Sequence, residues 1–319
     1  MKILVTGATG LLGSNIVKVA AEKYGAEVIG TIHKNKPLKP LPCALESMDI
    51  TDNQQVIKGI EKHKPNVVMH SAALVDPKIL EEKNNIGWKI YVEGTKNLAN
   101  VCNKNNTKMI FVSSDWIFDG LNPPYRENSI PHPVNYYGFL KAIGETVVQS
   151  ICKDYAIARV SAVYGINWAI PIPIPEKPYG FGSLVNYFLY KLQIGEEIKE
   201  WTDYINIKAN PTLASDAAEA LINIYIKGQT GIFHCSGREC ITRIELAKKV
   251  AKIFGFDEQL ITTALRDKND LNEWIGDNLR LPKETCLDVT ETEKQLNRKN
   301  IGVEDGLIKF KKEIERNGE

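Results

Sequence analysis

Tyr137 and Lys141 have the spacing of a proton-transferring pair on a helix. Residues at positions i and i+4 project from the same helical face. A free phenol has a pKa of about 10, and a neighbouring ammonium group lowers it toward the range in which a proton moves at neutral pH. A Tyr and a Lys four residues apart are common in any helix, so this pair indicates chemistry only if a further group joins it.

Ser113 and Ser114 supply that further group. They follow Met109–Val112, an apolar run that we expect to be a buried strand. Ligands of parallel α/β sheets bind at the carboxyl ends of the strands. A Ser114 hydroxyl in that position can hold a carbonyl oxygen while Tyr137 passes a proton to it. We therefore predict Ser114, Tyr137 and Lys141 as catalytic residues, with Asp115 and Trp116 beside the substrate.

A glycine-rich turn, Thr6–Gly13, lies between a predicted strand, Lys2–Thr6, and a predicted helix, Gly13–Tyr24. Its three glycines have the spacing G-x-x-G-x-x-G. Such glycines permit a tight turn, a close approach of backbone to a pyrophosphate, and close packing of helix on strand. The helix N-terminus attracts the anion. The turn predicts a dinucleotide site with these contacts: Gly7, Thr9, Gly10, Leu11 and Leu12.

The end of the second predicted strand, Glu27–Ile32, indicates which dinucleotide binds. An acidic residue there bonds the ribose of NAD, but this chain has His33 and Lys34. Lys34, helped by His33, can neutralise a 2′-phosphate, which favours NADP(H) over NAD(H). The alternative is that Lys34 is an ordinary solvated surface lysine. Asp49 or Ile50, after the next predicted strand, is placed to contact adenine.

The elements that must position these residues alternate between strand and helix over the first half of the chain. This alternation predicts an α/β fold, a Rossmann-type doubly wound parallel sheet with a smaller C-terminal α/β substrate domain. We expect an NAD(P)-binding domain at 1–165 with a return segment at about 207–235, and a substrate domain at 166–206 and 236–319. The proline-rich segment Ile170–Pro178 predicts an extended loop, which is either a wall of the substrate site or a surface insertion.

Composition excludes several other classes. The 319 residues carry 40 Lys and Arg against 39 Asp and Glu, a net charge of +1, which argues against a nucleic-acid-binding protein. The sequence contains no apolar run of about 18 residues, so we expect no membrane span. The glycine turn begins too early to leave room for a signal peptide. The 6 cysteines and 5 histidines show no ligand spacing, so we expect no metal site and free thiols in a cytoplasmic protein.

These segments together resemble the extended short-chain dehydrogenase/reductase family, and within it the dTDP-4-dehydrorhamnose reductases. The resemblance covers nearly the whole chain. It rests on the following residues: Gly7, Gly10 and Gly13; His70–Ala73; Ser113–Gly120; Pro124–Glu127; Pro133–Gly138; Arg159–Gly165; Asn210–Thr212 with Asp216; and Gly231–Gly237.

The resemblance implies reduction of a 4-keto group on a nucleotide-linked 6-deoxysugar, as in dTDP-L-rhamnose synthesis, with Tyr137 protonating the oxygen. It implies further cofactor contacts at Ser71, Ala72, Ala73 and Ser113. It also implies substrate contacts at Val75, Tyr164 and Trp168. Homodimers are common in this fold, and no apolar stripe of the sequence identifies such an interface.

The chain departs from the family at Tyr91, where an Asn usually shapes the site and relays protons. Trp116 replaces the second carboxylate that sugar-nucleotide dehydratases need, so we do not expect dehydration. Two alternatives stay open. One is an NAD-dependent sugar-nucleotide 4-epimerase, which shares the Ser, Tyr and Lys. The other is a non-catalytic protein like the regulatory subunit of methionine adenosyltransferase, which would have lost the Tyr or the Lys.

Overall fold

The structure is a computed structural model. It describes residues 1–34, 36–74, 80, 84–170, 184–201, 207–264 and 280–318. Val75 and the segment 171–178, both expected near the substrate, lie outside these residues.

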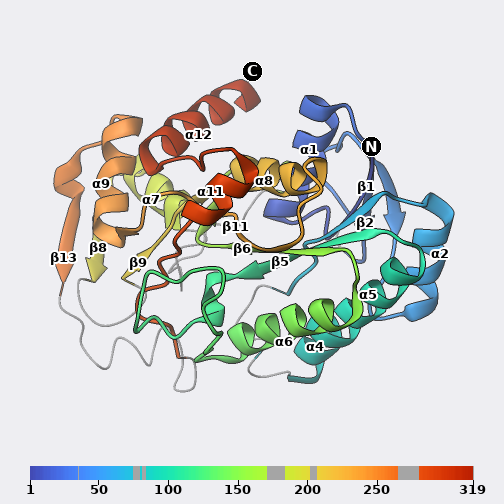
Figure 1. The fold of residues 1–319 in the computed structure, drawn as a ribbon. Helices are drawn as coiled ribbons and strands as arrows, with labels where there is room; N and C mark the ends of the chain where they lie inside the picture. Colours follow the sequence, from blue (N-terminus) through green and yellow to red (C-terminus); the bar gives the residue numbers. More distant parts are fainter. Residues whose placement is uncertain are drawn as a thin grey trace.

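A parallel sheet forms the centre of the molecule (Figure 1). Its seven strands among the described residues are ordered β11-β6-β5-β4-β1-β2-β3. The chain builds outward from β1 to β3 and then crosses back to β4, on the other side of β1, which leaves the topological switch point between β1 and β4. The predicted doubly wound α/β fold is therefore confirmed. The strands are β1 (Lys2–Thr6), β2 (Glu27–Ile32), β3 (Ala44–Ser47), β4 (Val67–His70), β5 (Lys108–Ser114), β6 (Tyr155–Val160) and β11 (Gly231–His234).

Helices cover both faces of this sheet because successive side chains of each strand, which point to opposite faces, are both apolar. Ile3 and Val5 enter the core beneath one set of helices, and Leu4 between them enters the opposite core. Figure 1 shows α1 (Leu11–Tyr24) and α8 (Ala214–Ile226) side by side on one face. The other face is covered by α2 (Asn53–His63), α5 (Thr95–Lys104) and α6 (Tyr136–Ile151).

The helical segment that precedes β5 is irregular. It begins with α4 (Asn84–Trp88), continues through a π-helical turn, η1 (Lys89–Gly94), and ends with α5. A π-helical turn inserts a residue into the helical ladder and is frequent at functional sites. The periodicity of apolar residues carries no signal for such an insertion.

The C-terminal part has a core of its own, formed mainly by α7 (Leu184–Gln193), α9 (Arg243–Phe254) and α12 (Val303–Gly318). Thr242 and Glu245 form a capping box that starts α9. Short strands complete this part in three pairs: β8 (Ile198–Trp201) with β13 (Ile261–Ala264), β7 (Val163–Tyr164) with β10 (Thr212–Leu213), and β9 (Lys208–Ala209) with β12 (Ile241–Thr242). The remaining short elements are η2 (Asp115–Ile117), η4 (Glu258–Leu260) and α11 (Thr290–Leu296).

One prediction about the cysteines is wrong. Cys240 and Cys286 form a disulfide whose Cα atoms are 5.5 Å apart. They lie 46 residues apart in the sequence, so only folding brings them together. Cys43, Cys102, Cys152 and Cys235 are free thiols, as expected.

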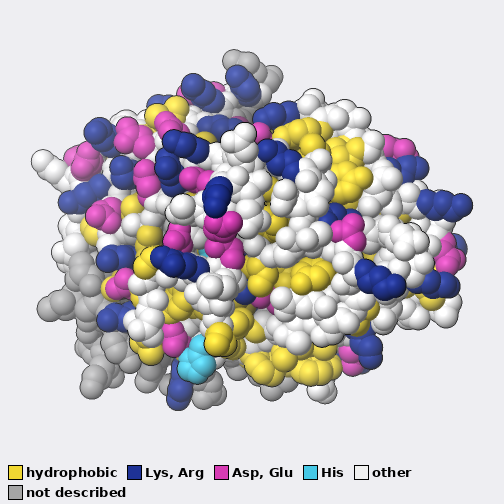
Figure 2. All heavy atoms as spheres, in the orientation of Figure 1, with side chains coloured by type: hydrophobic (Ala, Val, Ile, Leu, Met, Phe, Trp, Pro, Cys, Tyr) yellow, Lys and Arg dark blue, Asp and Glu magenta, His cyan; other side chains and the backbone are white. Residues whose placement is uncertain are grey.

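The surface carries charges of both signs. On the face seen in Figure 2, Lys and Arg side chains are interspersed with Asp and Glu, in keeping with the small net charge. Within the described parts of the chain, no helix has both the length and the apolar character needed to cross a membrane.

Candidate active site

The predicted site residues meet at one edge of the sheet. Thr6 of β1 pairs with His70 of β4, and His70 pairs with Phe111 of β5, so these three strands end close together. The Thr6 hydroxyl lies 2.7 Å from Nδ1 of His70. Ser113 and Ser114 follow Phe111 at the carboxyl end of β5. The glycine turn and the serines therefore flank the same topological switch point.

The glycine turn is shaped in a way that side chains would not permit. Gly7 has a φ of +69°, and a Cβ on it would lie 2.7 Å from Cα of Ala72. A Cβ on Gly13 would lie 2.1 Å from the carbonyl oxygen of Gly7. No side chain caps α1 at Gly10, so the N–H groups of its first turn face outward for an anion.

The segment Ser71–Ala73 is held against this turn. Ser71 Oγ donates a hydrogen bond of 2.7 Å to the Thr6 carbonyl oxygen, and the Ala72 N–H donates one of 3.2 Å to Thr6 Oγ1. Residues 71–73 and the residues predicted from the turn thus line one cradle.

The far end of this cradle carries both signs of charge. His33 and Lys34 are exposed at the end of β2. Nε2 of His33 lies 3.4 Å from Oδ2 of Asp49, which follows β3. Ile50 is buried, and a Cβ on Gly94 would lie 2.8 Å from its side chain. A carboxylate thus lies beside His33, one of the two residues expected to attract a 2′-phosphate.

The start of α6 sets Tyr137 beside Ser114. The Asn135 side chain caps the helix by accepting a hydrogen bond of 2.8 Å from the Gly138 N–H. A Cβ on Gly138 would lie only 2.0 Å from the carbonyl oxygen of Trp116, so a glycine is required for this close approach. As a result the phenol of Tyr137 and the hydroxyl of Ser114 lie close enough to interact.

The phenol of Tyr137 lies among aromatic rings. The edges of Trp116 and Tyr91 face it, with centroids 5.8 Å and 6.0 Å away. Burial, with a smaller contribution from the nearby Asp115, raises the pKa of Tyr137 to about 12, although Ser114 acts in the opposite direction. We expected Lys141 to lower this pKa, and that expectation is not met. The phenol is therefore protonated at neutral pH, which is the form that can donate a proton, although the raised pKa makes it a weaker acid than a free phenol.

Lys141 is buried one helical turn from Tyr137. Its Nζ donates a hydrogen bond of 2.8 Å to the Val112 carbonyl oxygen and lies 5.2 Å from the ring centroids of both Tyr91 and Phe111. Burial lowers the pKa of Lys141 to about 8. The ammonium has three protons, so donors remain for a ligand.

Asp115 does not face a substrate as we expected. Its carboxylate is 3 % exposed and accepts hydrogen bonds from Ser114, Ser161 and Thr285, at 3.1, 2.7 and 2.5 Å. Burial raises its pKa to about 6, although these three bonds act in the opposite direction. Asp115 is therefore an internal acceptor that orients the Ser114 hydroxyl. Sequence reasoning missed Ser161 and Thr285, because they lie 46 and 170 residues away and follow no spacing rule.

Two other expected substrate contacts are placed elsewhere. Tyr164 is fully buried in the C-terminal core, where its ring packs against Phe310, so we withdraw it. Trp168 packs on α1, where its Nε1 donates to Asn15 and Lys18 covers its ring. These contacts hold the indole near the glycine turn and do not support a role beside Tyr137.

The cradle fits a dinucleotide. It combines glycines that leave room for a ligand, uncapped helical N–H groups and the unused donors of Lys141. The buried hydroxyl of Ser113 also lacks a hydrogen-bond partner in the structure as described. No cluster of three or more His, Cys, Asp or Glu suited to a metal ion occurs among the described residues.

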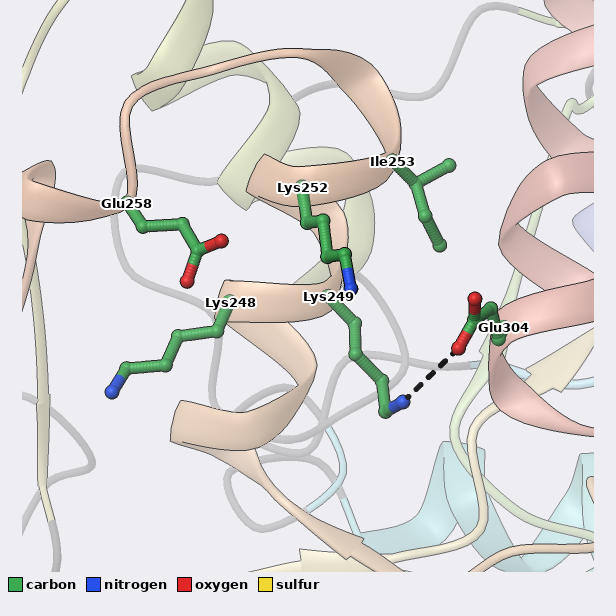
Figure 3. Close-up of a pocket in the computed structure, with 6 residues that line it drawn as sticks. All are labelled: Lys248, Lys249, Lys252, Ile253, Glu258 and Glu304. Carbon is green, nitrogen blue, oxygen red and sulfur yellow. Dashed lines mark ion pairs between the residues drawn. The ribbon is translucent and has the colours of Figure 1, made fainter.

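A separate hollow lies in the C-terminal part, between α9, η4 and α12 (Figure 3). Its lining comprises Lys248, Lys249, Lys252, Ile253, Glu258 and Glu304. Lys249 reaches toward Glu304, with 3.6 Å between Nζ and Oε2. None of these residues belongs to the sheet edge that carries Tyr137.

Comparison with known proteins supports the resemblance seen in the sequence. A family model described as RmlD substrate binding domain matches residues 1–312. A probable low-salt glycan biosynthesis reductase, Agl14 of Haloferax volcanii, is 29% identical over 308 residues, which is 96% of each chain. The dTDP-4-dehydrorhamnose reductase of Aggregatibacter actinomycetemcomitans is 27% identical over 304 residues, 92% of each chain.

A relative of a different kind matches equally well. Methionine adenosyltransferase 2 subunit beta of Xenopus laevis is 30% identical over 318 residues, which cover 97% of this chain and 88% of that protein.

Solved structures share the fold at lower identity. The dTDP-4-dehydrorhamnose reductase of Bacillus anthracis in complex with NADP has a TM-score of 0.78 at 20% identity, covering 98% of each chain. The UDP-glucose 4-epimerase of Thermus thermophilus in complex with NAD has a TM-score of 0.77 at 22% identity, covering 97% of each chain. With a match over nearly its whole length, the chain belongs to the RmlD substrate binding domain family, within the extended short-chain dehydrogenase/reductases.

Proposed function

We propose that this chain is an NAD(P)H-dependent reductase of a nucleotide-linked 4-keto-6-deoxysugar, of the dTDP-4-dehydrorhamnose reductase type that serves dTDP-L-rhamnose synthesis. The observation that carries the proposal is the placement of the Tyr137 phenol beside the Ser114 hydroxyl, at the carboxyl edge of the sheet that also carries the glycine turn. Two relatives that cover more than nine tenths of the chain are named as reductases, which supports this choice.

The residues of the chain have distinct tasks in such a reaction. A bound nicotinamide would supply the hydride. Tyr137 donates the proton to the carbonyl oxygen, and its raised pKa keeps that proton available at neutral pH. Ser114 donates a hydrogen bond to the same oxygen once its hydroxyl turns away from Asp115. Lys141 binds the cofactor through the donors that Val112 leaves free.

Two alternatives remain. A 4-epimerase uses the same Ser, Tyr and Lys, but it needs the phenol as a base as well as an acid, and the raised pKa of Tyr137 leaves little phenolate to act as that base at neutral pH. A methionine adenosyltransferase subunit beta is favoured by a relative at 30% identity. Against that reading, this chain keeps both Tyr137 and Lys141, placed as described above.

The deciding experiment is to mix the purified chain with NADPH and a dTDP-4-keto-6-deoxysugar and to follow the loss of NADPH absorbance. A cofactor deuterated at its transferable position should leave deuterium at C4 of the product. No turnover with any nucleotide 4-keto sugar, together with cofactor-dependent binding to a methionine adenosyltransferase catalytic subunit, would replace this proposal with the subunit role.

We propose NADP(H) over NAD(H), on the basis of Lys34 and His33 at the end of β2. Lys34→Asp should lower the ratio of kcat/KM for NADPH to that for NADH about tenfold or more, because a carboxylate repels a 2′-phosphate. The equally exposed Lys36→Asp serves as the control. A ratio that Lys34→Asp leaves unchanged would assign Lys34 to ordinary surface solvation.

Other features stay predictions. These are the homodimer, the absence of a nucleic-acid partner, and the division at residue 165 with its return segment at about 207–235. Disulfides are rare in a reducing cytosol, so the Cys240–Cys286 bond counts against the cytoplasmic location that we expected.

A further inference from the structure

Tyr91 is the position at which the chain departs from its family, and it lies within the π-helical turn η1. The usual Asn at this position has a small amide that can pass hydrogen bonds onward. Tyr91 instead presents a ring that is 2 % exposed. The contacts of its hydroxyl and of its ring show what Tyr91 does in place of the amide.

The hydroxyl of Tyr91 is fully engaged away from Lys141. It donates a hydrogen bond of 2.6 Å to the Leu74 carbonyl oxygen. A phenol has one proton to donate. Burial raises the pKa of Tyr91 above its ordinary value, so the phenol keeps this proton and donates it to the Leu74 carbonyl oxygen. Tyr91 therefore cannot relay a proton from Lys141. The hydroxyl instead anchors the backbone that leaves β4 through Ser71–Ala73.

The ring of Tyr91 lies next to both Tyr137 and Lys141. Its edge meets Tyr137 at a centroid distance of 6.0 Å, and the Lys141 Nζ lies 5.2 Å from its centroid. Phe111 offers a second ring to the same ammonium at 5.2 Å. An ammonium near the faces of two rings, away from water, is stabilised in its charged form.

We infer that Tyr91 is a positioning residue of the proposed active site: its ring holds the Lys141 ammonium charged and in place, and its hydroxyl holds the Leu74 carbonyl. The inference rests on the proposed function. The π-helical turn is the backbone adjustment that lets one side chain reach both partners.

Other titratable groups around Lys141 act differently from Tyr91. Glu145 on α6 raises the pKa of Lys141, and its carboxylate is paired with Arg159 of β6 at 2.8 Å. His70 of β4 is neutral, because burial and Lys141 lower its pKa to about 3. Tyr137 keeps its proton, because burial raises its pKa to about 12. The titration of Lys141 therefore reports on the ring of residue 91.

The experiment compares Tyr91→Leu, which loses ring and hydroxyl, with Tyr91→Phe, which loses only the hydroxyl. NADPH binding is measured by fluorescence titration from pH 6 to 10, and kcat is measured over the same range. In wild type, binding should weaken as the pH rises through the pKa of Lys141, near 8. Tyr91→Leu should move that midpoint down by about half to one pH unit. Tyr91→Phe should keep the midpoint and weaken NADPH binding about fivefold.

Phe310→Leu is the matched control, because it removes a buried ring from the C-terminal core. A midpoint shift in Tyr91→Leu no larger than that in Phe310→Leu would overturn the inference. So would a Tyr91→Asn variant with kcat equal to or above wild type, since the family's amide would then suffice. If Tyr91→Leu does not fold, an altered midpoint in Tyr91→Phe is sufficient to reject the role of the ring.

The outcome is separable from that of the proposed function. Wild type that binds NADPH but reduces no 4-keto sugar contradicts the reductase, while the binding midpoints still test Tyr91. Wild type that turns over normally with an unmoved midpoint in Tyr91→Leu contradicts the inference alone.

Discussion

The glycine turn and the corner around Asp115 contribute to one site but are built in opposite ways. The turn is made within Thr6–Gly13 and closes on itself through a hydrogen bond of 2.9 Å from the Gly10 N–H to the Gly7 carbonyl. The corner collects Ser114, Ser161 and Thr285 around one carboxylate, across as many as 170 residues of sequence. One region is thus local, and the other exists only in the folded chain.

This difference teaches which part of the site tolerates change. A local turn depends on the conformation of a few residues, so a single added methyl group should destroy it. The corner is held by several bonds from separate elements, so the loss of one should be partly compensated. The following predictions test this contrast, from the largest expected effect on catalysis to the smallest.

Tyr137→Phe, between the two regions, should lower kcat about 1,000-fold, because the proton donor is removed. NADPH affinity should stay within about threefold of wild type, because the phenol lies beside Ser114 and not beside the glycine turn. Steady-state kinetics and fluorescence titration measure the two quantities. A kcat near that of wild type would remove Tyr137 from the acid role.

Gly13→Ala should weaken NADPH binding about 100-fold, because the added Cβ would lie 2.1 Å from the Gly7 carbonyl oxygen. Gly25→Ala at the other end of α1 is the control, since a Cβ there meets nothing within 4 Å. Its φ of +59° costs stability but should leave binding unchanged. Equal losses of NADPH affinity in both variants would mean that the close approach at Gly13 is not needed for binding.

Asp115→Asn should lower kcat about tenfold, because the segment that carries Ser114 loses the charged acceptor that ties it to Ser161 and Thr285. It should also change the pH dependence of stability. The folded-state pKa of about 6 lies above the ordinary value of 3.8, so the native state binds an extra proton between these values. The unfolding free energy of wild type should therefore rise relative to the variant as the pH falls from 7 to 4.

The relative gain is about 2 kcal/mol between pH 7 and 4.5, and about 3 kcal/mol once the pH lies below both values, from a pKa raised from 3.8 to about 6 in a carboxyl that is 3 % exposed. Urea unfolding at pH 7, 5.5 and 4.5 measures it, with Asp305→Asn on the exposed side of α12 as the control. If the difference in unfolding free energy between wild type and Asp115→Asn does not vary with pH, Asp115 does not bind an extra proton in the native state.

Cys240→Ser should lower the unfolding free energy by about 2–4 kcal/mol and change kcat by less than about threefold. The segment that carries Thr285 keeps other anchors. The Lys283 and Glu284 N–H groups each donate a bond of 3.2 Å to the segment after Asp115, at Asp119 and Gly120. Wild type in dithiothreitol should behave like the variant. A tenfold loss of kcat would show that the disulfide itself holds the corner.

The features that could be predicted from the sequence differ from those that could not in the same way. Spacing alone identified the glycine turn, the alternation of strands and helices in the first half of the chain, and the pair of Tyr137 and Lys141, because each depends on neighbours within one or two elements. It misplaced Asp115 and Tyr164, since whether a side chain faces a ligand or the core is decided by elements far away in the chain. It read the cysteines as free thiols, because a disulfide depends on where two distant loops meet.

By itself, then, the sequence determined the order of strands and helices, the doubly wound fold and the edge at which the chemistry must lie. These follow from hydrophobic periodicity and from the handedness of strand–helix–strand connections, both of which are local properties. Only the tertiary structure decided how the groups at that edge are used. It buried Lys141 between two rings, turned Tyr91 onto Leu74 and gave Asp115 three hydroxyl partners. Burial and distant partners set the charge and direction of each group, and no spacing within the chain records them.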